Sequence, residues 1–213
     1  MSHSEVVRMT VANRRLIADL LEGLDDEQWR AETLCRGWTV HHMAAHLVQP
    51  MLVGFGRFFA TALRYRGDTD KTVDHLARRL ARRSRSELVT TLRERADDGL
   101  APARVGPMGP FADTCIHLRD IARPLGLAVD VPQEHWVVLL DYLTADGVAP
   151  ALVPAGRLDG LALAATDAEW SRGDGEPVRG PVEALALAVT GRVVALGELS
   201  GAGVARLSER LRG

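Results

Sequence analysis

Apolar side chains recur every three or four residues over most of the first 150 positions, which is the spacing of one face of an α-helix. The first such segment follows Ser2, and Glu5 stands at the spacing of a capping box. Thr39 is a good N-cap for a long helix over residues 40–63. Pro50 predicts a kink inside that helix because its ring removes one helical hydrogen bond. The pattern predicts a bundle of four or five helices.

Capping residues and prolines mark further helix boundaries. The predicted segments are residues 72–82, residues 86–96, a helix from Pro110 to Pro124 and a helix from Pro132 to Gly147. A stretch rich in glycine and proline at 99–109 separates the second and third of these segments. The whole region to about residue 150 is therefore expected to be helical.

The pattern changes after residue 150. The predicted elements are a short apolar strand at 161–165, a turn at 173–175, a second strand around Val178, a helix from Pro181 to Gly191 and an amphipathic segment at 204–211. We therefore expect a mainly α protein with two domains. A helical bundle occupies residues 1–150, and a small α/β domain occupies residues 151–213.

Composition narrows the class of protein. Of the 213 residues, 46% are hydrophobic and 25% charged, which is an ordinary globular balance. The net charge of −2 does not suit a dedicated nucleic-acid binder. No apolar run approaches the roughly 20 residues of a membrane span, and the N-terminus lacks the form of a signal peptide. Two cysteines are too few for a disulfide framework, which suits a reducing cytosol. Together with the charge and the hydropathy, this predicts a cytoplasmic protein without nucleic-acid or membrane partners.

Two pairs of possible metal ligands stand four residues apart, a spacing that places both members on one helix face. His42 and His46 form the first pair, and Asp113 and His117 form the second. Facing helical pairs of this kind build metal sites in helical bundles. The same spacing also arises without a metal, because a carboxylate in the first helical turn interacts well with the helix dipole and a histidine can be a hydrogen-bonded core residue.

Three segments resemble one family. Residues 35–47, Cys-Arg-Gly-Trp-Thr-Val-His-His-Met-Ala-Ala-His-Leu, resemble the signature C-x-G-W-T-V-x-x-x-x-x-H-L of the mycothiol-dependent maleylpyruvate isomerase family, a part of the DinB-like superfamily of metal-binding helical bundles. Residues 113–123, Asp-Thr-Cys-Ile-His-Leu-Arg-Asp-Ile-Ala-Arg, resemble its second signature. Residues 178–192 and 199–201 resemble its small C-terminal domain. The resemblance implies a DinB-like four-helix bundle followed by a small α/β domain.

The resemblance also implies a site. Its metal ligands would be His46, Asp113 and His117, with His42 as a neighbour outside the site. Family members with isomerase activity have Glu at the position of Asp113, which is one methylene longer. Two imidazoles and a carboxylate leave open positions on a divalent ion and suit Zn²⁺, Ni²⁺ or Fe²⁺.

The activity that the resemblance implies uses mycothiol as a low-molecular-weight thiol cosubstrate together with a small-molecule substrate. The enzyme would be a cis–trans isomerase of a maleylpyruvate-like diacid or a thiol S-transferase. The alternative is a non-catalytic bundle that serves as a small-molecule binding or regulatory protein. DinB-like bundles often pair, so the resemblance is compatible with a homodimer, and the sequence leaves the oligomeric state open.

Three more residues have two interpretations each. Arg192 matches an arginine of the family's C-terminal domain and is the candidate catalytic residue that holds a substrate carboxylate; it can equally be a cation at a helix C-terminus. Asp120 either orients His117 from one helical turn away or forms a surface salt bridge with Arg119 or Arg123. Trp38 is expected to be a packing anchor and not a substrate platform.

Overall fold

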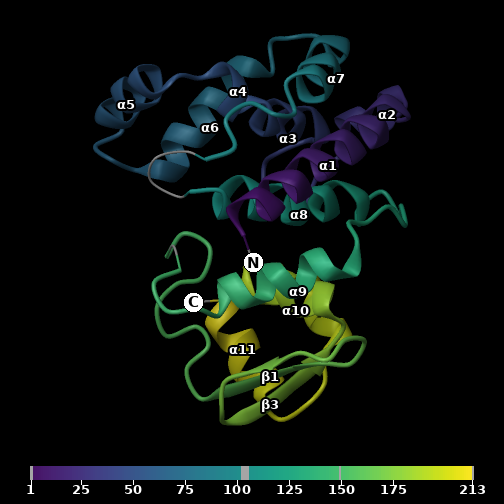
Figure 1. Ribbon diagram of the computed structural model, residues 1–213, viewed down its shortest axis with the longest axis vertical. Coiled ribbons are helices and arrows are strands. Elements are labelled where there is room, and N and C mark those ends of the chain that lie inside the picture. The colour runs from purple at the N-terminus through teal and green to yellow at the C-terminus, as the bar shows by residue number, and fades with distance from the viewer. Residues whose placement is uncertain (1, 102–105, 149, 213) are drawn as a thin grey trace. The chain divides into compact units, whose positions relative to one another are not determined.

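The computed structural model describes residues 2–101, 106–148 and 150–212, and the chain divides into two compact units, residues 1–130 and 131–213. The first unit is helical (Figure 1). Its helices are α1 (His3–Glu22), α2 (Asp26–Arg30), α3 (Val40–Leu47), α4 (Gln49–Leu52), α5 (Phe55–Arg64), α6 (Thr69–Leu80), α7 (Arg85–Glu94) and α8 (Met108–Ala122). The expected helical bundle is confirmed.

Side-chain caps set the starts of several of these helices, which is why the sequence located them well. Ser2, Asp25, Thr39 and Ser84 each accept from a backbone N–H of the first helical turn and form a capping box with the residue three positions on. These caps satisfy N–H groups that have no partner inside the helix. The helix starts predicted after Ser2 and Thr39 therefore agree with the structure.

The expected long helix over residues 40–63 is wrong. The structure breaks this segment into α3, α4 and α5, with the first break at Val48 and the second at residues 53–54. Pro50 lies in the first turn of α4, where its missing N–H costs nothing. Gly54 is the N-cap of α5. The proline therefore ends one helix and begins another instead of bending a continuous one.

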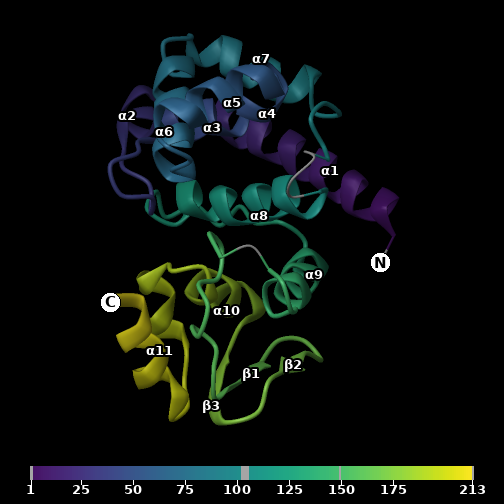
Figure 2. The same cartoon turned by 90° about the vertical axis from the view of Figure 1, so that its left-hand side faces the viewer.

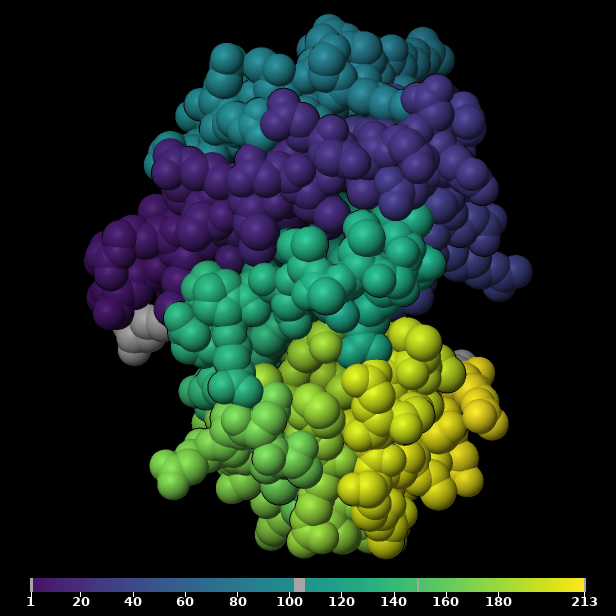
Figure 3. Space-filling model, turned by 90° about the vertical axis from the view of Figure 1, so that its right-hand side faces the viewer, coloured from purple at the N-terminus to yellow at the C-terminus, as the bar shows by residue number. Residues whose placement is uncertain are grey.

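The core of the first unit lies among α1, α3, α6, α7 and α8. α1 packs against α7 and α8, and α3 packs against α6, α7 and α8. In Figure 3 the side chains of α1, in purple, lie directly against those of α8, in green. A buried cation also ties the unit together, since Nη1 of Arg14 donates to the carbonyl oxygens of Ala96 (2.7 Å) and Asp98 (2.6 Å). The pairing of α3 with α8 positions the site described below.

The second unit begins before the expected domain boundary at residue 150. It contains α9 (Gln133–Leu143), β1 (Leu161–Ala165), β2 (Ser171–Arg172), β3 (Glu176–Gly180), α10 (Val182–Val189), the 3₁₀ helix η1 (Val193–Glu198) and α11 (Gly203–Arg212). The helix after Pro132 belongs here because α9 packs against α10. Helical periodicity cannot reveal this, since it identifies a helix and not its packing partner.

A three-stranded sheet forms one layer of the second unit, in the order β2-β1-β3 (Figure 2). β1 pairs antiparallel with β2 and parallel with β3, with Leu163 opposite Val178. These two side chains are buried, and α10 contacts both β1 and β3. The short β2 was not predicted as a strand. The expected small α/β unit is confirmed.

Among the described residues, every helix is too short or too polar to cross a lipid bilayer.

Replacing Gly175 with Ala is expected to destabilise the protein. Gly175 has φ +138°, and a Cβ there would lie 2.2 Å from the carbonyl oxygen of Gly160, the residue before β1. The free energy of unfolding should fall by roughly 1–3 kcal/mol, measured by chemical denaturation. Gly197→Ala is the control, because a Cβ at that position meets no atom within 4 Å. Equal stability of the two variants would contradict this account of the turn.

Candidate metal centre

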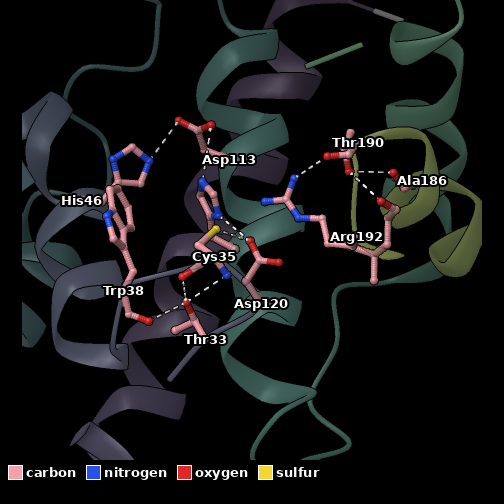
Figure 4. A network of polar contacts seen from close by, with 11 residues as sticks. Thr33, Cys35, Trp38, His46, Asp113, Asp120, Ala186, Thr190 and Arg192 are labelled. Carbon is pink, nitrogen blue, oxygen red and sulfur yellow. Dashed lines mark hydrogen bonds and ion pairs between the residues drawn. The ribbon is translucent and has the colours of Figure 1, made fainter. Parts of the chain in front are cut away.

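His46, Asp113 and His117 converge from two helices of the first unit. His46 lies in the last turn of α3, whereas Asp113 and His117 lie one turn apart on α8. Nε2 of His46 is 4.0 Å from Oδ2 of Asp113, and Nε2 of His117 is 3.9 Å from Oδ1 of Asp113. Dashed lines in Figure 4 join Asp113 to its histidine neighbours. The carboxylate therefore stands between the two imidazoles.

These three residues can hold a metal ion. Their ligand atoms lie within 4.8 Å of one another. Both histidine side chains are 13% exposed and Asp113 is 38% exposed, so the group reaches solvent through the carboxylate. Two imidazoles and one carboxylate form a ligand set that catalytic Zn²⁺ sites use, with a further position open. Although Asp113 is shorter than Glu, it stands equally near both rings, so the residues fit a divalent ion.

His42 lies outside this group. Its Nδ1 is 2.9 Å from the hydroxyl of Thr39, the N-cap of α3, and its backbone N–H donates to the same hydroxyl. The ring of His42 therefore belongs to the helix cap. Helical spacing alone had left the pair of His42 and His46 open as a metal-binding pair.

Asp120 orients His117 from one turn further along α8. Its carboxylate is fully buried, and its Oδ2 is 2.8 Å from Nδ1 of His117. The surface salt bridge with Arg119 or Arg123 that the sequence left open would need an exposed carboxylate; Arg119 instead donates to the carbonyl oxygens of Leu127 and Val129. Because Nδ1 is engaged by Asp120, Nε2 of His117 faces Asp113.

A loop between α2 and α3 closes over Asp120. The thiol of Cys35 donates to Oδ2 of Asp120 (3.3 Å), and the backbone N–H of Leu34 donates to its carbonyl oxygen (3.1 Å). Cys35, His117 and Asp120 form a second group with ligand atoms within 4.8 Å of one another. The hydrogen bonds within this group account for its arrangement, so we interpret it as support for His117. Cys35 is half-buried, while Cys115 is fully buried.

Trp38 packs against His46, as expected of an anchor. The ring centroids are 5.2 Å apart, and the indole N–H donates to the Asp74 carboxylate (2.8 Å) on α6. The backbone carbonyl of Trp38 accepts from the N–H and the hydroxyl of Thr33. Trp38 is thus fixed at both ends beside the metal centre. Sequence reasoning missed Asp74, because its role depends on how α6 packs on α3.

The two histidines have opposite electrostatic environments. Burial, together with a smaller effect of the nearby His117, lowers the pKa of His46 to about 4, and Asp113 opposes this shift only in part. Burial alone would lower the pKa of His117 too, but the hydrogen bond that its ring donates to Asp120 and the neighbouring Cys35 raise it to about 10. In the metal-free protein at neutral pH, His46 is therefore neutral and His117 is protonated.

Arg192 lies in the second unit. Its Nη1 donates to the carbonyl oxygen of Thr190, the C-cap of α10 (2.8 Å; Figure 4). This bond agrees with the interpretation of Arg192 as a cation at a helix C-terminus. A role toward a substrate carboxylate stays a prediction.

A helical bundle in which two facing helices bring together two histidines and a carboxylate is one class of metal-binding scaffold. The family model described as the mycothiol maleylpyruvate isomerase N-terminal domain matches residues 11–141, more than half of the chain. The chain therefore belongs to this family.

Two solved structures are similar to the chain. One is the crystal structure of the mycothiol-dependent maleylpyruvate isomerase, with 14% sequence identity, a TM-score of 0.60 and coverage of 95% of this chain and 93% of that chain. The other is a mutant of that isomerase in which a histidine is replaced by alanine, with 15% identity, a TM-score of 0.55 and the same coverage. At these identities the likeness shows the shared fold. No curated protein matches the chain.

Zn²⁺ binding to the metal-free protein is expected to tighten as the pH rises from 6 to 8. Because the pKa of His117 is about 10, the ion must displace a proton, and the apparent affinity should gain about tenfold per pH unit. Asp120→Asn removes the carboxylate that raises this pKa, so its slope should be shallower. Competition with a chromophoric chelator measures both slopes. Asp19→Asn, at a surface ion pair, is the control; equal slopes for wild type and D120N would contradict the assignment.

Proposed function

We propose that this chain is a metal- and mycothiol-dependent enzyme, either a cis–trans isomerase of a maleylpyruvate-like diacid or a thiol S-transferase. One observation carries the proposal: His46, Asp113 and His117 have their ligand atoms within 4.8 Å of one another in a chain that belongs to the mycothiol maleylpyruvate isomerase family. The solved structures with the same fold are named for that activity, which supports the proposal.

In this proposal the three residues hold a divalent ion, with Zn²⁺ the first choice and Ni²⁺ or Fe²⁺ compatible with the same ligands. When bound, such an ion stabilises a thiolate on an open position, because the cation lowers the pKa of a thiol. Thiolate chemistry covers both proposed reactions: reversible addition to an activated double bond, which permits rotation, and displacement of a leaving group. No cysteine of the chain is needed as the nucleophile.

The chain's own residues prepare the site for this chemistry. Asp120 keeps the proton of His117 on Nδ1, which leaves Nε2 to bind the ion. Trp38 covers one side of His46 and limits its movement. Asp113 carries a negative charge between two rings, so a bound divalent ion would leave the group with a net positive charge. Such a site favours a thiolate and an anionic diacid over neutral ligands.

Metal content is the first test. Wild-type protein purified without a His-tag should contain one metal ion per chain by mass spectrometry, and His46→Ala and His117→Ala should contain none, because each removes one of three protein ligands. His75→Ala is the matched control, since His75 is hydrogen-bonded to Tyr65 outside the group. Wild-type protein that stays empty after incubation with Zn²⁺ or Ni²⁺ would overturn the proposal and favour the non-catalytic binding or regulatory alternative.

The second test is thiol-dependent activity. Metal-loaded wild type should isomerise a maleylpyruvate-like diacid, followed by absorbance, or transfer a thiol, only when mycothiol is present. Asp113→Ala should lower kcat/KM by more than about 100-fold, since loss of a ligand exceeds the usual effect of an outer-shell change. Asp113→Glu should retain activity, because it supplies the same carboxylate. An Asp113→Ala variant as active as wild type would exclude Asp113 as a ligand.

A further inference from the structure

His46 and Gln49 contain the two buried polar side-chain atoms that have no hydrogen-bond partner among the described residues. These atoms are Nδ1 of His46 and Oε1 of Gln49. Gln49 is 6% exposed and begins α4, three residues after His46. A buried polar atom without a partner is unfavourable, and two such atoms in neighbouring turns are complementary if Nδ1 carries a proton. The donor on His46 and the amide oxygen acceptor on Gln49 then lie only three residues apart along the chain, each without another partner among the described residues.

His117, the other proposed metal ligand, shows how an acceptor at Nδ1 directs Nε2 toward the metal position. Nδ1 of His117 is engaged by Asp120, and its Nε2 faces Asp113. Nε2 of His46 faces the same carboxylate, so both rings offer the same nitrogen to a metal ion. A histidine that binds a metal through Nε2 must carry its proton on Nδ1, and that proton normally has an acceptor. The side chain of Gln49 lies close enough to the ring of His46 to interact with it.

We propose that Gln49 is the positioning residue of His46: its amide oxygen accepts the Nδ1 proton and keeps Nε2 free for the metal. This inference rests on the proposed metal site. It gives the two histidines unequal partners, a neutral amide for His46 and a carboxylate for His117.

The break between α3 and α4 holds Gln49 in place. Val48 is both the C-cap of α3 and the N-cap of α4, and Pro50 follows in the first turn of α4. The loop at Gly99, with φ +61°, passes so close to Pro50 that a Cβ there would lie 2.6 Å from the Pro50 carbonyl oxygen. The loop at Gly99 thus packs against α4, and the side chain of Gln49 is buried near His46.

The test uses Gln49→Met, which keeps a long unbranched side chain without the acceptor, and Gln49→Glu, which keeps an acceptor. In metal-free wild type, long-range ¹H–¹⁵N NMR should show the His46 proton on Nδ1, and Q49M should shift it toward Nε2. The dissociation constant for Zn²⁺, from chelator competition, should rise about tenfold in Q49M and stay near wild type in Q49E. Met51→Leu, a buried neighbour on α4, is the packing control and should match wild type.

A His46 proton on Nε2 in metal-free wild type would overturn the inference, even if Q49M does not fold. Unchanged Zn²⁺ affinity in Q49M would also overturn it and leave Gln49 a packing residue. If wild type binds no Zn²⁺, the proposed function fails, but the position of the His46 proton still decides the role of Gln49. The two failures are therefore distinguishable.

Discussion

The fully buried carboxylate of Asp120 is the interaction on which the candidate site depends. A buried carboxylate needs hydrogen-bond donors inside the protein, and the ring of His117 and the thiol of Cys35 are two such donors. The backbone carbonyl of the same residue holds Leu34. One residue of α8 therefore fixes a histidine that is a candidate metal ligand and holds the loop that leads into α3, which carries His46.

The charge arrangement follows from this burial. Both histidines lie in an environment that disfavours a positive charge, but only His117 has a carboxylate against its Nδ1, so their pKa values move in opposite directions. Asp113 then stands between one neutral ring and one protonated ring. A divalent ion would take the place of the proton on His117, which links metal uptake to pH.

The family model and the solved structures establish the family and the fold. The proposed chemistry has separate support, from the arrangement of a few side chains. The family model covers the region from α1 to α9, and the fold extends over nearly the whole chain. The proposed chemistry depends on a few side chains of α3 and α8. Asp113 is compatible with that chemistry because its oxygens stand equally close to both imidazoles.

Features that depend only on neighbours along the chain could be predicted from the amino-acid sequence. Caps such as Thr39 begin helices through bonds within one turn, and a four-residue spacing puts Asp113 and His117 on one helix face. Packing between distant segments decided the rest. Only the tertiary structure places His46 opposite that pair, buries Asp120 where the sequence allowed a surface salt bridge, and buries Nδ1 of His46 and Oε1 of Gln49 without other partners among the described residues. Burial and contact across helices are set by the whole core, which no local pattern encodes.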